Sequence, residues 1–132
     1  KIKQMQELDK RIILYENVKN MGNFMRKCRY AISAGGTTLY ELCACGIPTV
    51  CFSFAENQQQ FTCEMGKRKI MYYAGDAREN DNIGRDIVHK LCCFLDQPEE
   101  TENYIRRMQQ LVDGKGTRRI VDVLKSYKKE GK

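Results

Sequence analysis

Residues 30–41, Tyr-Ala-Ile-Ser-Ala-Gly-Gly-Thr-Thr-Leu-Tyr-Glu, have the composition of an anion-binding turn. Gly35 and Gly36 carry no Cβ atoms that would keep a ligand from the backbone. Thr37 and Thr38 bring hydroxyl groups that can donate hydrogen bonds to phosphate oxygens. If a helix begins at Thr37, its first N–H groups have no partner within the helix, and its dipole adds partial positive charge. The spacing therefore predicts a phosphate site at this turn.

Glu41 lies four residues after Thr37, about 6 Å along a helix that rises ~1.5 Å per residue. A carboxylate there can accept hydrogen bonds from both hydroxyls of a ribose whose phosphates lie at the glycine turn. The alternative is that Gly35 and Gly36 form an ordinary tight turn and that Glu41 is a solvated helix residue. A glycine pair alone does not decide between the two, since many α/β turns contain one.

A strand, a glycine turn and a helix must position these groups. Residues 30–34 form a short apolar run that is typical of a buried parallel strand. Leu39, Leu42 and Cys43 recur at the spacing of one helix face, and Gly46 ends that helix. In a parallel sheet such a turn lies at the carboxyl end of the strand, where open α/β folds bind ligands.

The same alternation continues along the chain. It predicts further strands at residues 11–15, 49–54 and 70–73, and helices at residues 1–9, 17–28 and 59–66. Later helices are expected at residues 83–95, from Pro98 and from Thr117. We therefore expect an α/β domain with a Rossmann-like, mostly parallel sheet flanked by helices, covering residues 1–132, with residues 76–132 as its helical C-terminal part.

The formal net charge of +6 lies largely near the carboxyl end. The cations there are Arg118, Arg119, Lys125, Lys128, Lys129 and Lys132. Such a segment could touch nucleic acid or acidic lipid, or it could be a solvated helix end, where cations are favoured. No nucleic-acid motif accompanies the charge, so we expect no nucleic-acid partner. No apolar run approaches the ~18 residues of a membrane helix, and we expect a cytoplasmic protein without a transmembrane segment.

Seven cysteines and one histidine are present, and we expect neither a metal nor a cofactor. Cys43 and Cys45 are two apart on a helix and face different directions, while Cys92 and Cys93 are adjacent, which is poor geometry for zinc. The thiols are interpreted as small buried hydrophobes in a reducing compartment. His89 is expected to be structural or exposed.

Residues 33–50, Ser-Ala-Gly-Gly-Thr-Thr-Leu-Tyr-Glu-Leu-Cys-Ala-Cys-Gly-Ile-Pro-Thr-Val, together with Ala-Glu-Asn-Gln at 55–58, resemble the carboxyl-terminal nucleotide-binding half of glycosyltransferase-B-fold proteins. The likeness covers roughly residues 11–75. It is nearest to the UDP-sugar hydrolases of pseudaminic acid biosynthesis and to spore-coat polysaccharide proteins. It is more distant to the N-acetylglucosaminyltransferase of lipid II synthesis. The resemblance implies a further strand and a whole amino-terminal domain, and the start without methionine makes us expect a trimmed half of a two-domain enzyme.

The resemblance also implies that Asn57 and Gln58 reach the sugar hydroxyls or the pyrophosphate. The alternative is that they belong to an ordinary polar loop and helix cap. Glu56 stands where the nearer relatives usually carry Asp. Asn17, Val18 and Met21 are candidates for contact with the base. The residues expected to bind the substrate are therefore Ser33, Gly35, Gly36, Thr37, Thr38, Glu41, Asn57 and Gln58.

Three functions are compatible with these residues. The first is a UDP-sugar hydrolase of surface polysaccharide or pseudaminic acid biosynthesis, in which this half binds UDP while the catalytic base comes from the missing half. The second is the donor-binding half of a glycosyltransferase with a carbohydrate or lipid-linked acceptor. The third is a non-catalytic partner subunit. In the first two cases we expect UDP binding without turnover by this chain alone.

Overall fold

The structure of the chain is a computed structural model, which describes residues 2–130, with side chains to residue 127. Its helices are α1 (Ile2–Leu8), α2 (Met21–Met25), α3 (Thr38–Cys45), α4 (Glu56–Lys67), α5 (Ile83–Asp96), α6 (Pro98–Leu111) and α7 (Gly116–Glu130). Its strands are β1 (Ala31–Ala34), β2 (Thr49–Ser53) and β3 (Tyr72–Asp76).

The three strands form one parallel sheet in the order β1-β2-β3. Because both strand pairs are parallel, all three carboxyl ends meet at the same edge of the sheet. The structure confirms an α/β fold with a parallel sheet, flanking helices and C-terminal helices. The sheet is small and open.

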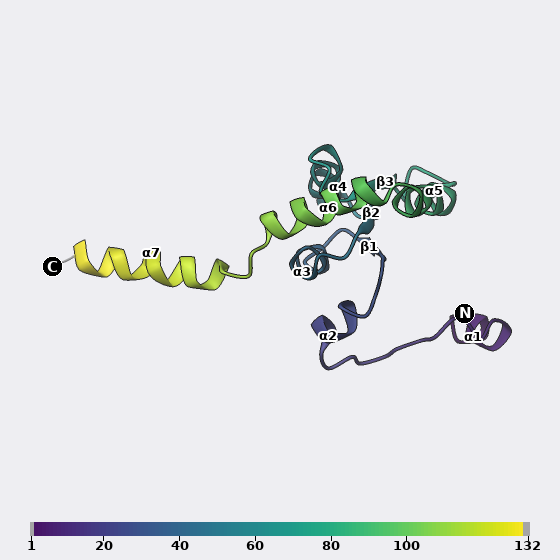
Figure 1. The fold of residues 1–132 in the computed structure, drawn as a ribbon, viewed down its shortest axis with the longest axis horizontal. Helices are drawn as coiled ribbons and strands as arrows, with labels where there is room; N and C mark the ends of the chain where they lie inside the picture. Colours follow the sequence, from purple (N-terminus) through teal and green to yellow (C-terminus); the bar gives the residue numbers. More distant parts are fainter. Residues whose placement is uncertain (1, 131–132) are drawn as a thin grey trace.

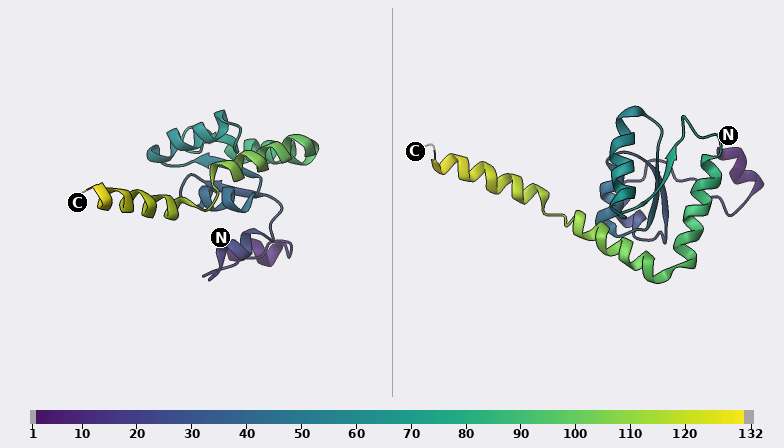
Figure 2. Two further views of the ribbon diagram at one scale, coloured as in Figure 1. Left: turned by 60° about the vertical axis from the view of Figure 1, so that its left-hand side comes forward. Right: turned by 90° about the horizontal axis from the view of Figure 1, so that it is seen from above.

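The helices α3 and α4 lie on one side of the sheet and α5 on the other (Figure 1). Apolar side chains pack on each side. The core on the first side includes Leu39, Cys51, Met65 and Met108. The core on the second side is formed by Val50, Ala74, Phe94 and Tyr104. α6 contributes to both cores, since it runs from the end of α5 toward α3 (Figure 2).

The helix α3 forms as its sequence predicts. Leu39, Leu42 and Cys43 are buried on one side of it. Gly46 ends the helix in the left-handed conformation, with φ of 65°, which glycine adopts without steric cost. After this helix the chain enters β2, which pairs with β1 so that Ser33 is opposite Cys51.

β1 is parallel as expected, but it is an edge strand and only partly buried. Ile32 is 51% exposed, because α5 packs against β2 and β3 and leaves the same face of β1 uncovered. The prediction of a fully buried strand was therefore wrong for one face.

The strand predicted at residues 11–15 is wrong. Residues 12–16 are irregular, and the segment runs outside the sheet between α1 and α2 (Figure 1). Ile13 is 62% exposed and Tyr15 is 56% exposed. The Tyr15 ring still packs edge-on against Phe24 of α2, with 4.8 Å between the ring centroids. A strand needs a neighbour for its backbone hydrogen bonds, and in this structure the sheet ends at β1.

The helix predicted at residues 17–28 is confirmed only as the shorter α2. The side chain of Asn20 accepts a hydrogen bond from the N–H of Asn23 at 3.0 Å, which fixes the start of the helix at Met21. The turn that follows ends it after Met25.

Two further boundaries differ from the prediction. α4 begins at Glu56 rather than at residue 59. β3 covers Tyr72–Asp76 rather than residues 70–73, because Ile70 belongs to the turn that ends α4. Its N–H donates to the carbonyl of Met65 at 2.9 Å, and Lys69 before it has a φ of 51°.

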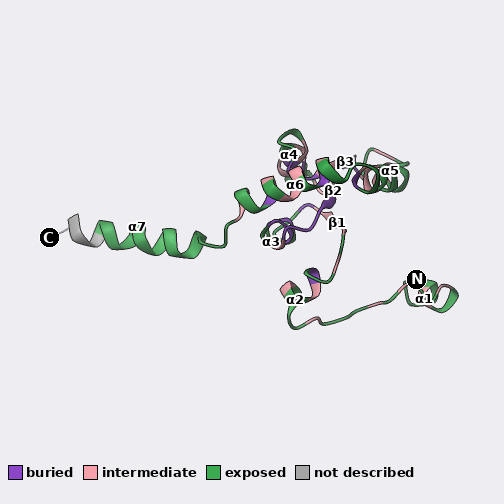
Figure 3. Ribbon diagram, in the orientation of Figure 1, coloured by how far each residue is buried: buried purple, intermediate pink, exposed green. Residues whose placement is uncertain are grey.

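The C-terminal helices occur where they were expected. α5 and α6 bury Phe94, Tyr104 and Met108, whereas the described side chains of α7 are all exposed (Figure 3). Within residues 2–130, no helix is both long and apolar enough to cross a bilayer. His89 lies on α5 and is exposed, which is one of the two alternatives predicted for it.

The prediction that the thiols are buried is correct for Cys43 and Cys51 and wrong for Cys92, which is exposed. Burial raises the pKa of Cys43 to about 11 and that of Cys51 to about 12, so both thiols stay neutral at physiological pH. These two cysteines act as small apolar core residues.

Candidate functional site

The glycine turn lies at the carboxyl edge of the sheet, between β1 and α3. The N–H of Gly35 donates to the carbonyl of Phe52 in β2 at 2.9 Å, which continues the sheet ladder by one residue and fixes the turn. Gly36 follows with no such bond and is exposed. The start of α3 is thus held at the end of β1. Gly35 is buried, and the turn faces solvent only from Gly36 onward.

The first N–H groups of α3 are available to a ligand. The N–H of Leu39 donates to the carbonyl of Gly36 at 3.1 Å, and that of Tyr40 to Thr37 at 3.0 Å. Within the described residues, the N–H groups of Gly36, Thr37 and Thr38 have no backbone acceptor, and Thr37 makes no side-chain cap. These donors, together with the positive end of the helix dipole, favour an anion.

Gly35 and Gly36 differ in what surrounds them. A Cβ at Gly35 would come within 2.7 Å of Thr62 Cγ2 and 2.8 Å of Gln58 Cβ, so the turn packs directly on α4. A Cβ at Gly36 would meet nothing within 4 Å, and its φ is not positive. Nothing in the described chain requires a glycine at position 36, and an external group that approaches the backbone would require one.

Hydroxyl and carboxylate groups surround this turn. Thr37 and Thr38 are exposed, and Glu41 is exposed on the side of α3 opposite Leu39. Residues three and four apart on a helix are neighbours, so Thr37, Thr38 and Glu41 share that outer side. Ser33 is half-buried in β1, and its hydroxyl donates to the carbonyl of Ala34 at 3.0 Å.

The structure brings the second predicted cluster to the first. Asn57 and Gln58 lie in the first turn of α4, not in a loop, and Gln58 lies against Gly35. The Gln58 Oε1 atom accepts a hydrogen bond from the N–H of Phe54 at 3.1 Å, which leaves its amide NH₂ as a donor. Asn57 is exposed. The side chain of Gln58 thus bonds to the residue before the cap position of α4, and the helix itself has no side-chain cap. Ligand contacts by Asn57 and Gln58 both stay predictions.

The proposed base-binding residues are not placed at this edge by a strand. Asn17, Val18 and Met21 would follow the predicted strand at residues 11–15, and that strand is not formed. Asn17 has a φ of 54° in the irregular segment, and Met21 begins α2.

Sequence reasoning missed a buried polar cluster at the ends of β2 and β3. Asp76 is 6% exposed and pairs in register with Ser53. Its carboxylate accepts hydrogen bonds from Arg78 Nη2 at 2.7 Å, Arg78 Nε at 3.0 Å and the Arg78 N–H at 2.9 Å. Ser53 Oγ is 2.9 Å from the hydroxyl of Tyr73. The sequence signal was an Asp that closes a strand, with an Arg two residues later.

This cluster has an electrostatic consequence. Hydrogen bonds from Arg78 hold the pKa of Asp76 well below its usual range. A depressed folded-state pKa gives stability that is present above the unfolded pKa and is lost as the pH falls. The Arg78 guanidinium is thereby paired, so an anion at the glycine turn would depend on N–H groups and hydroxyls rather than on this cation.

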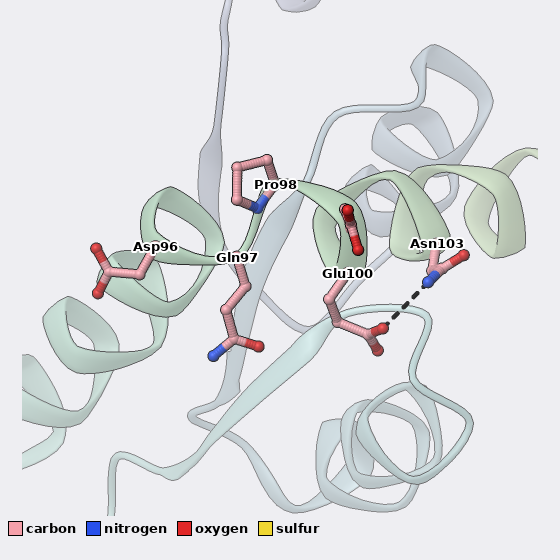
Figure 4. A pocket seen from close by; sticks show the side chains of 6 residues that line it. Asp96, Gln97, Pro98, Glu100 and Asn103 are labelled. Atoms are coloured by element: carbon pink, nitrogen blue, oxygen red, sulfur yellow. Dashed lines mark hydrogen bonds between the residues drawn. The ribbon is translucent and has the colours of Figure 1, made fainter.

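A hollow of about 600 Å³ lies elsewhere, where α5 meets α6 at the amino edge of the sheet (Figure 4). Asp96, Glu99 and Glu100 contribute carboxylates to it, and Asn103 donates to Glu100 at 3.1 Å. Three carboxylates disfavour a phosphate. The hollow is therefore not the anion site, and the glycine turn remains the candidate. Among the side chains described, those of residues 2–127, no three of His, Cys, Asp or Glu are grouped to hold a metal ion.

Comparison with known proteins returns no matching family model, curated protein or solved structure.

Proposed function

We propose that this chain is the UDP-sugar-binding domain of a nucleotide-sugar hydrolase that acts in bacterial surface polysaccharide or pseudaminic acid biosynthesis. The nucleotide diphosphate binds at the carboxyl edge of the sheet, against the turn from Gly35 to Thr38. The domain corresponds to the C-terminal half of a glycosyltransferase-B fold. The reaction class and the sugar pathway rest on the resemblance of residues 33–58 to that family.

One observation supports the diphosphate site above the others. The N–H groups of Gly36, Thr37 and Thr38 have no backbone acceptor in the described chain, and Gly36 leaves open space beside them. A diphosphate carries the negative charge and the acceptor oxygens that these donors lack. Glu41, one turn further along α3, accepts the ribose hydroxyls in this proposal.

The chemistry of the domain follows from these donors. When the bond between the anomeric carbon and the pyrophosphate oxygen breaks, negative charge develops on the leaving diphosphate. N–H groups and hydroxyls already aimed at that charge stabilise it without reorganisation. Attack by water requires a general base, which in this proposal lies on the amino-terminal half. We therefore expect binding of UDP without turnover.

Titration calorimetry with UDP, UMP and uridine tests the proposal. We expect binding heat at millimolar UDP and weaker heat with UMP, and we expect uridine to bind least because it lacks the phosphates. Removal of one hydroxyl by Thr38→Val should weaken UDP binding about tenfold, the value of one hydrogen bond to a charged group.

Thr117→Val, an identical change at an exposed residue of α7, is the matched control and should bind UDP like the unaltered chain. Folded protein that gives no heat with millimolar UDP, or that binds uridine as well as UDP, would contradict the diphosphate site.

A further inference from the structure

α7 carries an apolar stripe that the described chain leaves exposed. The exposed fractions are 64% for Ile120, 39% for Val121, 54% for Val123, 64% for Leu124 and 71% for Tyr127. The spacing places these side chains on one side of the helix. α7 extends away from the sheet and its covering helices, beyond the turn that contains Gly114 (Figures 1 and 2).

The polar side of α7 is strongly basic. Residues 115–132 contain seven Lys and Arg and two Asp and Glu, which gives +5 of the +6 net charge of the whole chain. Arg119 bonds to Asp113 at 2.9 Å and so anchors the start of the helix, and Arg118 lies 4.0 Å from Asp122. Lys125 forms no ion pair with any described side chain.

An isolated helix of this length is only marginally stable in water. α7 has 15 residues, and every described side chain from Gly116 to Tyr127 is exposed. The helix therefore gains most from a partner that covers the apolar stripe, and that partner must tolerate a dense positive charge beside it.

We propose that α7 lies flat on a bilayer surface that contains anionic lipids, with the stripe in the boundary between headgroups and acyl chains. Such a surface is both apolar and negatively charged, and a basic amphipathic helix matches both properties. A helix pair between two copies would cover the stripe but would bring two sets of +5 together. Nucleic acid would use the charge but leave the stripe in water.

Flotation of the whole chain with lipid vesicles tests this inference. We expect binding to vesicles with about 30% phosphatidylglycerol in phosphatidylcholine to be at least about tenfold stronger than to pure phosphatidylcholine, because several cations lie near the surface. Binding should weaken in about 0.5 M NaCl, where charges are screened.

Two variants test the two properties of the helix. Leu124→Gln should lower vesicle binding at least about tenfold, since an apolar side chain no longer enters the boundary between headgroups and acyl chains. Its control is Leu95→Gln, the same change at a residue of α5 that is 54% exposed. Lys125→Glu changes the charge of α7 from positive to negative at one residue, and vesicle binding should fall about five-fold for each unit of charge. Its control is Lys10→Glu, on an exposed turn, which should change vesicle binding little.

Several outcomes would overturn the proposal. Equal binding to both kinds of vesicle, or equal binding by Leu124→Gln and Leu95→Gln, would show that charge and stripe do not act together on lipid. A dimer in sedimentation equilibrium that Leu124→Gln dissociates would assign the stripe to a second copy. Binding to duplex DNA that exceeds binding to the anionic vesicles would assign the charge to nucleic acid.

Discussion

Two strand–turn–helix units, β1–α3 and β2–α4, lie side by side at the carboxyl edge of the sheet, and their helices begin differently. At the start of α4 the side chain of Gln58 bonds to the N–H of Phe54, and Glu56 places a carboxylate on the first residue of the helix. Neither α3 nor α4 has a side-chain cap, but in α3 the first acidic residue, Glu41, comes only at the fourth position.

The difference indicates which turn is left for a ligand. α4 has the carboxylate of Glu56 at its first residue, and this negative charge disfavours a second anion there. α3 has no acidic residue at its first three positions, and Gly36 leaves the approach open. Of these two helix starts, that of α3 is therefore the better place for an external anion.

The largest expected effect is on α3, the helix that follows the glycine turn. Leu39 is fully buried under α3, and Leu39→Ala should lower the free energy of unfolding by about 2–5 kcal/mol because it leaves a cavity. Urea unfolding followed by circular dichroism measures it. Tyr40→Ala, at the 46% exposed neighbour, is the control and should cost clearly less. Equal losses would mean that Leu39 does not anchor the helix.

The packing between the two units is tested by Gly35→Ala. The new Cβ would lie 2.7 Å from Thr62 Cγ2, so we expect a loss of about 1–3 kcal/mol in the free energy of unfolding. Thr62→Ser removes the obstructing methyl group and keeps the hydroxyl that donates to Gln58. In the double variant part of the loss should return. Strict additivity of the two single changes would refute direct packing of the turn on α4.

The turn between β2 and α4 is tested by Gln58→Ala. This change keeps the Cβ against Gly35 and removes the acceptor for the N–H of Phe54, so about 0.5–1.5 kcal/mol of stability should be lost. Gln59→Ala, one residue along and exposed, should change the midpoint of urea unfolding little. If the two variants unfold alike, the hydrogen bond from the N–H of Phe54 to Gln58 does not contribute to stability.

The smallest effect on stability is expected at Gly36, in the turn between β1 and α3. Gly36→Ala should change the free energy of unfolding by less than about 1 kcal/mol, because its Cβ meets nothing and its φ is not positive. The same change should weaken UDP binding at least about tenfold by lengthening a hydrogen bond to the phosphate. Calorimetry that finds UDP affinity unchanged would mean that no ligand approaches this backbone.

The sequence predicts the local units well because their signals are local. Leu39, Leu42 and Cys43 define α3, and Gly46 marks its end, without reference to the rest of the chain. The apolar run at residues 11–15 could be read as a strand, but a strand exists only where a neighbour pairs with it. The start of β3 was misplaced because the left-handed conformation of Lys69 extends the end of α4.

The candidate site shows the same limit. The glycines, hydroxyls and Glu41 could be identified from spacing alone, since they lie within one turn and one helix. The packing role of Gly35 could not, because it depends on Thr62, which lies 27 positions later. The burial of Asp76 depends on its pairing with Ser53 across the sheet, although its bond to Arg78 is local.

A titration of ¹⁵N-labelled protein with UDP, followed by amide chemical shifts, tests the diphosphate site most directly. The N–H groups of Gly36, Thr37 and Thr38 should shift first and furthest, while those of residues 98–103 beside the acidic hollow should stay in place. If the glycine turn does not respond while another part of the chain does, the assignment of the anion site to the start of α3 is wrong.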